Sequence, residues 1–209
     1  GVYALIRRAG KRWWVWSGGL AATAILTILL VSPIAIEPLF NDYKPLPAGE
    51  VRDALEVQAK EAGIEPDRIF VFDGSRQSNN FTANVSGLGH SARIAISDVA
   101  LKGASLDEVK AVTGHEIGHY VLGQIWWLVS VFSLLAILLF FLADRLYARV
   151  ARTFGSAAAI GDPRGLPVLM FMLTLFAFLA QPVRNGLSRY DESAADAYSL
   201  RTVNLPDAL

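Results

Sequence analysis

The sequence of 209 residues contains no cysteine and only three histidines. The absence of cysteine excludes disulfide bonds and any metal site built from thiolates. The formal net charge is zero, and no nucleic-acid-binding motif is present, so a nucleic-acid partner is not expected. Hydrophobic residues make up 53% of the chain, which is high for a soluble domain. The composition therefore favours a membrane protein whose metal ligands, if it has any, are histidines and carboxylates.

Three uncharged apolar runs, residues 13–36, 125–142 and 166–183, fit the thickness of a bilayer. The first run is longer than the apolar core of a secretory signal peptide, so we interpret it as a true span. A basic cluster within residues 7–12 precedes it and reads as a membrane flank. The alternative, three buried helices of a soluble protein, is weak because such runs rarely occur together outside membranes. We expect an integral membrane protein.

The predicted spans divide the chain into four segments. These are residues 1–36, a basic flank and transmembrane helix; 37–124, a soluble segment; 125–183, two transmembrane helices with their loop; and 184–209. Two crossings return the chain to its starting side, so 37–124 and 184–209 are predicted to face one side and 143–165 the other. The distribution of Lys and Arg favours a cytoplasmic location for 143–165, but long soluble segments obey this rule poorly, and the orientation stays open. We expect the sequence to be a piece of a longer protein.

The most informative motif is His115-Glu116-Ile117-Gly118-His119, the pattern H-E-x-x-H. Two histidines four apart lie on one face of a helix, so both imidazoles can reach one metal ion. The glutamate lies partway round the axis, where it can act as a general base without being a ligand. Zinc hydrolases need this combination, because the ion lowers the pKa of water and polarises a carbonyl. The alternative is an accidental pair of surface histidines.

The motif lies in a run that the sequence predicts to be helical. Ser105 and Glu108 have the spacing of a capping box, which marks the helix start. No proline interrupts the run, which passes through Gly114, Gly118 and Gly123 directly into the second apolar stretch. The glycines weaken the helix locally but permit close approach of another backbone. We therefore expect the metal-binding turn near the mouth of a membrane helix.

A catalytic zinc site of this kind needs a third protein ligand on the same side as the histidines. The third span returns the chain there, just before Glu192 and Asp196, which lie four apart on one helical face. We predict that Glu192 is the ligand, with Asp191 as the competing carboxylate. Asp196 is predicted to accept a hydrogen bond from a ligand histidine, which would fix its tautomer. Arg189 is a candidate for holding Glu192 or for stabilising the reacting oxyanion. The alternative is that it only forms a structural ion pair.

The polar segment 44–104 has a secondary structure of its own. Residues 50–62 read as an amphipathic helix, and 68–73, 81–86 and 92–97 as short strands. The last two strands flank a glycine-rich turn and are predicted to form a hairpin. His90 lies in that turn and is interpreted as a turn residue rather than a ligand.

With these residues placed, the chain resembles the membrane zinc metallopeptidases of the CAAX prenyl endopeptidase type, and more distantly the heat-shock membrane protease of bacteria. The similarity includes the H-E-x-x-H motif and residues 38–41, 45–47, 73–76, 87–89, 93–98, 107–109, 188–189, 192 and 195–196. It implies a zincin-like helical protease core of the gluzincin class with a small β-sheet and about three transmembrane helices here. It also implies that Thr82, Ala83 and Asn84, where the family often has Asn-Ala, bind the substrate as an edge strand. An ordinary sheet strand is the alternative.

We interpret the chain as the catalytic part of a membrane zinc endopeptidase, with Zn²⁺ held by His115, His119 and Glu192 and with Glu116 as general base. Its expected partners are membrane lipid and a peptide or protein substrate. The resemblance implies either processing near a lipidated C-terminal cysteine or degradation of misfolded membrane proteins. A non-enzymatic zinc-binding membrane protein is the rival from another class, and Glu116 argues against it. A bacterial inner membrane or an endomembrane is the expected location.

Overall fold

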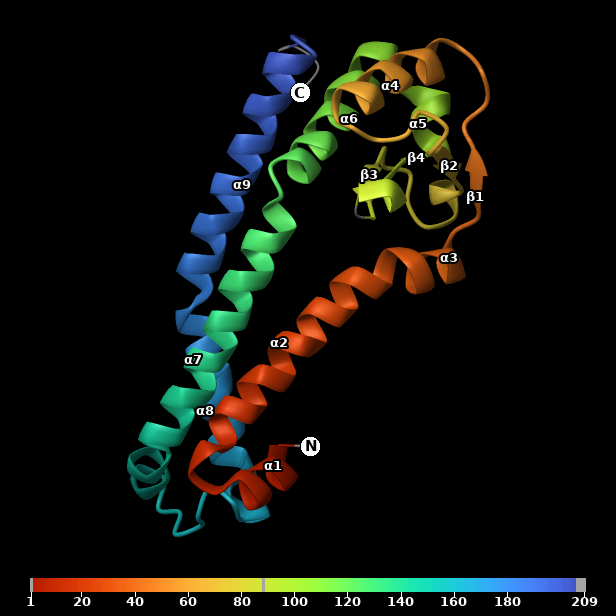
Figure 1. The fold of residues 1–209 in the computed structure, drawn as a ribbon. Helices are drawn as coiled ribbons and strands as arrows, with labels where there is room; N and C mark the ends of the chain where they lie inside the picture. Colours follow the sequence, from red (N-terminus) through yellow and green to blue (C-terminus); the bar gives the residue numbers. More distant parts are fainter. Residues whose placement is uncertain (1, 88, 206–209) are drawn as a thin grey trace. The chain divides into compact units, whose positions relative to one another are not determined.

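The computed structural model describes residues 2–87 and 89–205, apart from the side chains of residues 2, 33 and 34. Leu88 of the predicted turn and the outermost residues of the first and last predicted segments lie outside this range. The chain divides into two compact units (Figure 1). One unit comprises Gly1–Ile28 and Trp126–Leu187, and the other comprises Leu29–Ile125 and Ser188–Leu209. Three helices contribute residues to both units: α2 (Trp13–Val31), α7 (Gln124–Thr153) and α9 (Gln181–Thr202).

All regular secondary structure in the described part of the first unit is helical. Besides its shares of the three long helices it contains α1 (Val2–Ala9), a 3-10 turn at Gly10–Arg12, a second at Pro163–Gly165, and α8 (Leu166–Leu179). Its core includes Trp13, Tyr147 and Met172, and the indole N–H of Trp13 donates to Asp144 Oδ1 at 2.6 Å. A Cβ atom at Gly18 would lie 2.7 Å from Cγ1 of Ile137, so helices α2 and α7 can approach only because this position is glycine.

Among the described residues, two helical stretches are long and apolar enough to cross a membrane. They are Tyr3–Val31, which runs from α1 through the 3-10 turn into α2, and Gln124–Thr153, which is α7. A third span exists only if α8 and α9, which meet at a bend of 40°, are counted together. Alone, α8 has 14 residues, fewer than the roughly 20 that a bilayer requires. The expected class, a mainly helical membrane protein with a small sheet, is confirmed. The third predicted run, residues 166–183, is not one continuous helix, because α8 ends at Leu179 and α9 begins at Gln181.

The second unit packs helices on a four-stranded sheet. Its elements are a π-helical segment at Ser32–Ile36, α3 (Glu37–Phe40), β1 (Tyr43–Pro45), α4 (Glu50–Glu61), β2 (Ile69–Phe72), a 3-10 turn at Gly74–Arg76, β3 (Ala83–Ser86), another at Gly89–Ser91, β4 (Arg93–Ser97), α5 (Asp98–Gly103) and α6 (Leu106–Val121). The strand order is β1-β2-β4-β3, with β2 parallel to β4 and the other pairs antiparallel. The predicted helix at 50–62 and the predicted hairpin are confirmed, and the strand predicted at 68–73 is observed as β2. The short edge strand β1 was not expected.

The core of this unit lies between the sheet and helices α4 and α6. Ile94 and Ile96 of β4 are fully buried and pack with Leu55 of α4 and with Val109 and Ile117 of α6. Because side chains alternate along a strand, the residues between them face the other side of the sheet. The capping box at the start of α6 is confirmed: Ser105 Oγ accepts from Glu108 N–H, and the Glu108 carboxylate accepts from Ser105 N–H.

The predicted continuous helix from residue 105 into the second apolar run is wrong. Helix α6 ends at Val121, and Gly123 follows with φ of +64° before α7 begins at Gln124. A left-handed glycine just beyond a helix is a common stop signal, because glycine adopts positive φ without a steric penalty. The metal-binding helix and the apolar helix are therefore two elements.

Candidate metal centre

Two helices far apart in the sequence, α6 and the C-terminal part of α9, carry the candidate site. Gly118 of α6 faces α9 so closely that a Cβ atom there would lie 3.1 Å from the Cα of Ala195. One turn earlier, a Cβ at Gly114 would lie 2.9 Å from Ser199 Oγ, and that hydroxyl donates to the carbonyl of Ala111 at 2.8 Å. The glycines of the motif thus allow the contact that brings α9 to the histidines.

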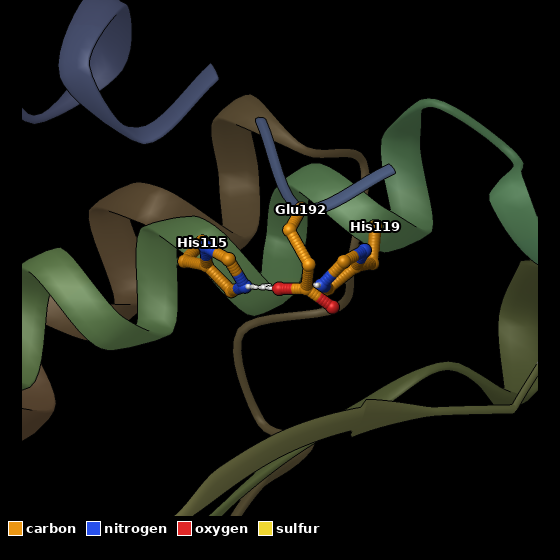
Figure 2. A group of neighbouring side chains, drawn as sticks. All are labelled: His115, His119 and Glu192. Carbon is orange, nitrogen blue, oxygen red and sulfur yellow. Dashed lines mark hydrogen bonds and ion pairs between the residues drawn. The ribbon is translucent and has the colours of Figure 1, made fainter. Parts of the chain in front are cut away.

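The side chains of His115, His119 and Glu192 converge (Figure 2). One ligand atom from each lies within 4.8 Å of the others. The Nε2 atoms of the two histidines are 3.0 Å apart, and Glu192 Oε2 lies 3.2 Å from the first and 3.8 Å from the second. Helix α9 presents Glu192 to both rings, while α6 places the histidines one turn apart. These are the three residues that the sequence predicts as ligands.

Each histidine has a partner on its other ring nitrogen. His115 Nδ1 lies 2.8 Å from Asp196 Oδ1, the position that the sequence predicts. His119 Nδ1 hydrogen-bonds the side-chain oxygen of Gln124, whose Nε2 donates to the carbonyl of Asp191 at 2.9 Å. The amide orientation follows from that donor bond. Both partners of the histidines are acceptors, so we assign the ring proton to Nδ1 in each case.

The position of the ring protons determines whether the three side chains can bind a cation. With protons on both Nδ1 atoms, the two Nε2 atoms present lone pairs to one another, and the carboxylate of Glu192 adds a third acceptor. No proton donor lies among the three atoms, so their convergence is electrostatically unfavourable without a cation. Two imidazoles and one carboxylate are the protein ligands of a common class of catalytic zinc sites. The donor set therefore fits a metal ion.

Glu116 lies beside the ligand pair and is partly buried. Its carboxylate makes no hydrogen bond or ion pair with any described residue. Burial raises the pKa of its carboxyl, nearby His119 and His115 lower it, and Glu192 raises it. A raised pKa makes the carboxylate a stronger base, which suits a group that must accept a proton from water.

The remaining predicted site residues lie differently. Arg189 is exposed, and its side chain forms no ion pair with Glu192 in the described part of the chain. Asp191, the competing carboxylate, is only 4% exposed and is not part of the converging group. Its Oδ2 has no hydrogen-bond partner, and burial raises its pKa. His90 lies in the turn between β3 and β4, as predicted, with its Nδ1 atom 3.4 Å from Glu65 Oε1, and it is not part of the converging group.

Strand β3 lies at an edge of the sheet, beside the metal-binding helix α6. Ser97 N–H donates to the carbonyl of Thr82 at 2.9 Å, so this facing pair is hydrogen-bonded. Bonded and non-bonded pairs alternate in an antiparallel ladder, so Asn84 also turns its backbone to β4, whereas Ala83 and Val85 turn theirs outward. Of Thr82, Ala83 and Asn84, only Ala83 therefore offers backbone groups at the free edge.

Sequence reasoning missed Gln124. Because the run was interpreted as one helix, a residue five positions after His119 was expected about 140° away round the axis. The signal that marks it is Gly123, read as a helix stop rather than as a local weakness.

Comparison with known proteins identifies the class. The sequence profile of peptidase family M48 matches residues 45–209, so the chain belongs to this family. Members are metallopeptidases, so the expected cofactor is a metal ion. The chain is 31% identical over 201 residues to the "Uncharacterized metalloprotease YhfN" of Bacillus subtilis (strain 168), covering 95% of this chain and 47% of that protein.

Further relatives carry more specific names. The "CAAX prenyl protease 1" of Saccharomyces cerevisiae is 34% identical over 197 residues, covering 86% of this chain and 43% of that protein. The crystal structure of S. mikatae Ste24p superposes with a TM-score of 0.77 at 29% identity, covering 96% of this chain and 50% of that one. The chain spans about half the length of the curated relatives it matches.

We predict that Glu192→Gln lowers zinc affinity by more than the roughly 10–100-fold that loss of an outer hydrogen-bond partner costs. The reason is that it replaces the anionic carboxylate of the predicted third ligand with a neutral amide, which binds a cation more weakly. The matched change Asp191→Asn, one residue away, should leave the metal bound. Zinc content and chelator competition on both purified variants make the comparison. Loss of zinc from Asp191→Asn with retention in Glu192→Gln would show that the wrong carboxylate has been chosen.

Proposed function

We propose that this chain is the catalytic part of a membrane-embedded zinc endopeptidase. The observation that carries the proposal is the convergence of His115, His119 and Glu192 with a free carboxylate, Glu116, beside them. Metal storage or transport needs ligands but not this extra carboxylate, so a purely structural or carrier role explains less of the site. Membership of a peptidase family supports the same conclusion.

Zinc is the metal that the ligands favour, because two imidazoles and one carboxylate form a frequent catalytic zinc set and no thiolate is available. The chemistry that zinc supplies when bound in such a site is Lewis acidity, which polarises a carbonyl and lowers the pKa of water. His115 and His119 would hold the ion from α6 and Glu192 from α9. Asp196 orients His115 through its Nδ1 proton.

The proton chemistry falls to Glu116. Its carboxylate accepts a proton from the attacking water as the scissile carbonyl carbon gains its new bond to oxygen. The same group then gives that proton to the leaving amine when the C–N bond breaks, so the base is regenerated. Arg189 is exposed near the ligand glutamate on α9 and is the candidate cation for the oxyanion. Its role is independent of Glu192, with which it does not pair in the described structure.

The substrate is proposed to bind as an extra strand on β3. The backbone N–H and C=O groups of Ala83 and Val85 face outward and can pair with an extended peptide. The side chains of these two residues pack toward the core beside α6, so a peptide on this edge would run past the metal-binding helix. The edge strand thus aligns a peptide bond with the site without contacts that depend on its sequence.

The substrate class is proposed from the relatives named CAAX prenyl protease 1. We infer cleavage near a lipidated C-terminal cysteine, in a bacterial inner membrane or an endomembrane. Degradation of misfolded membrane proteins remains the alternative.

We predict that Glu116→Gln retains zinc and loses about 10²–10⁴-fold in turnover, because an amide cannot accept the proton from water. The control is Asp107→Asn, the same kind of change at an exposed position of the same helix. Zinc content and turnover on any cleaved peptide are measured together. Near wild-type turnover of the purified Glu116→Gln protein would refute the assignment of the base.

The second prediction concerns the edge strand. Ala83→Pro removes an outward-facing N–H and leaves the ladder to β4 intact, so it should raise KM with little change in kcat or melting temperature. Asn84→Pro, its neighbour, should instead lower the melting temperature because that N–H faces β4. Steady-state kinetics and thermal unfolding distinguish the two. An unchanged KM for an extended peptide in Ala83→Pro would argue against strand addition.

The third prediction concerns lipidation. A farnesylated peptide ending in a C-a-a-X sequence should be cleaved faster than the same peptide without the lipid, and faster than unfolded membrane-protein substrates. Mass spectrometry of the products gives rates and cleavage positions. Equal rates with and without the lipid would reject the lipid-directed function while leaving the endopeptidase assignment in place.

A further inference from the structure

We infer that Gln124 is a positioning residue that couples two of the three metal ligands through a single side chain. The inference rests on the proposed function, because it concerns the same metal centre. Gln124 is the first residue of α7 and is only 6% exposed. Its oxygen hydrogen-bonds His119 Nδ1, and its nitrogen donates to the carbonyl of Asp191 at 2.9 Å. The oxygen and the nitrogen of this buried amide are thus both hydrogen-bonded to residues of the candidate metal centre.

The first bond fixes the ring of His119. The donor bond to Asp191 orients the amide, so its oxygen faces the ring and accepts the Nδ1 proton. The Nε2 lone pair is thereby left for the metal, and the ring cannot rotate without losing the bond. An outer partner of this kind fixes the tautomer and the orientation of a ligand histidine.

The second bond holds the opposite helix. Asp191 immediately precedes Glu192 on α9, so tying its carbonyl to Gln124 fixes the backbone next to the third ligand. A carbonyl oxygen has two lone pairs and can accept this bond in addition to its helical one. The same amide therefore sets the distance between His119 on α6 and the ligand-bearing turn of α9.

The break between α6 and α7 makes this arrangement possible. In an uninterrupted helix, a residue five positions after His119 would point about 140° away from it. The positive φ of Gly123, +64°, turns the chain so that Gln124 folds back onto the histidine. Gly123 therefore sets the backbone turn that allows Gln124 to hydrogen-bond His119.

The test is the zinc affinity of three variants of the 209-residue chain, measured by competition with a chromophoric chelator and accompanied by melting temperatures. Gln124→Met is close in shape and removes both hydrogen bonds. Gln124→Glu keeps an acceptor for His119 but has no proton for Asp191. Gln58→Met is the matched control, because Gln58, like Gln124, donates to a backbone carbonyl, that of Lys110 at 2.9 Å, but hydrogen-bonds none of the three predicted ligands.

We expect Gln124→Met to bind zinc about 10–100-fold more weakly than the wild type. Gln124→Glu should show a smaller loss, since one of the two bonds survives. Gln58→Met should lower the melting temperature and keep wild-type zinc affinity. This pattern separates positioning of ligands from general stabilisation.

Wild-type zinc affinity in folded Gln124→Met would overturn the inference, as would an equal loss of affinity in Gln58→Met. If Gln124→Met does not fold, Gln124→Glu decides: weaker zinc binding than Gln58→Met supports the coupling, and wild-type binding refutes it. A wild-type protein that binds no zinc would refute the proposed function itself, and a wild-type protein that binds zinc independently of Gln124 would refute only this inference.

Discussion

The repulsion among three converging acceptors is the constraint on which the rest of the site depends. With the ring protons assigned to Nδ1, His115 and His119 turn the lone pairs of their Nε2 atoms toward each other at 3.0 Å, and Glu192 brings a carboxylate to the same point. Such an arrangement is held against its own electrostatics by the surrounding fold, and a cation converts the repulsion into attraction. The partners on the far side of each ring, Asp196 and Gln124, keep the nitrogens in this state.

Close packing of α6 against α9 and the sheet holds the three side chains together. Gly118 lets α6 approach the backbone of Ala195 on α9, and Ser199 ties the same pair of helices one turn further on. On its other side α6 packs on the sheet through Val109 and Ile117, beside the edge strand β3. The helix that carries the histidines is therefore fixed by the ligand helix on one side and by the proposed substrate strand on the other.

Much of this could be predicted from the sequence, because the decisive features are local or periodic. The H-E-x-x-H spacing fixes the relation of two histidines, the capping box fixes the start of α6, and the i, i+4 spacing of Glu192 and Asp196 places both on one face. The pattern of β-branched and aromatic residues also predicts β2, β3 and β4 and the glycine-rich turn between the last two, but not β1. The roles of these residues in metal binding and catalysis stay predictions.

What could not be predicted depends on backbone conformation at single residues and on contacts across the fold. The positive φ of Gly123 ends α6 and creates the site of Gln124, which the hydrophobic pattern hides because apolar residues continue on both sides. The bend between α8 and α9 likewise lies inside an apolar run, and its only mark in the sequence is Pro182 in the first turn of α9. Which backbone groups of β3 face outward depends on its register with β4, and the sequence alone does not specify that register.

The central claim is that one zinc ion is bound by two imidazoles and one carboxylate of this chain. X-ray absorption at the zinc edge of the purified, zinc-loaded protein tests it most directly. The account predicts a first shell of nitrogen and oxygen only, at about 2.0–2.2 Å, with the outer-ring scattering of two imidazoles. A first shell with three imidazoles, which would require His90, or with one imidazole and added water oxygens, would contradict it.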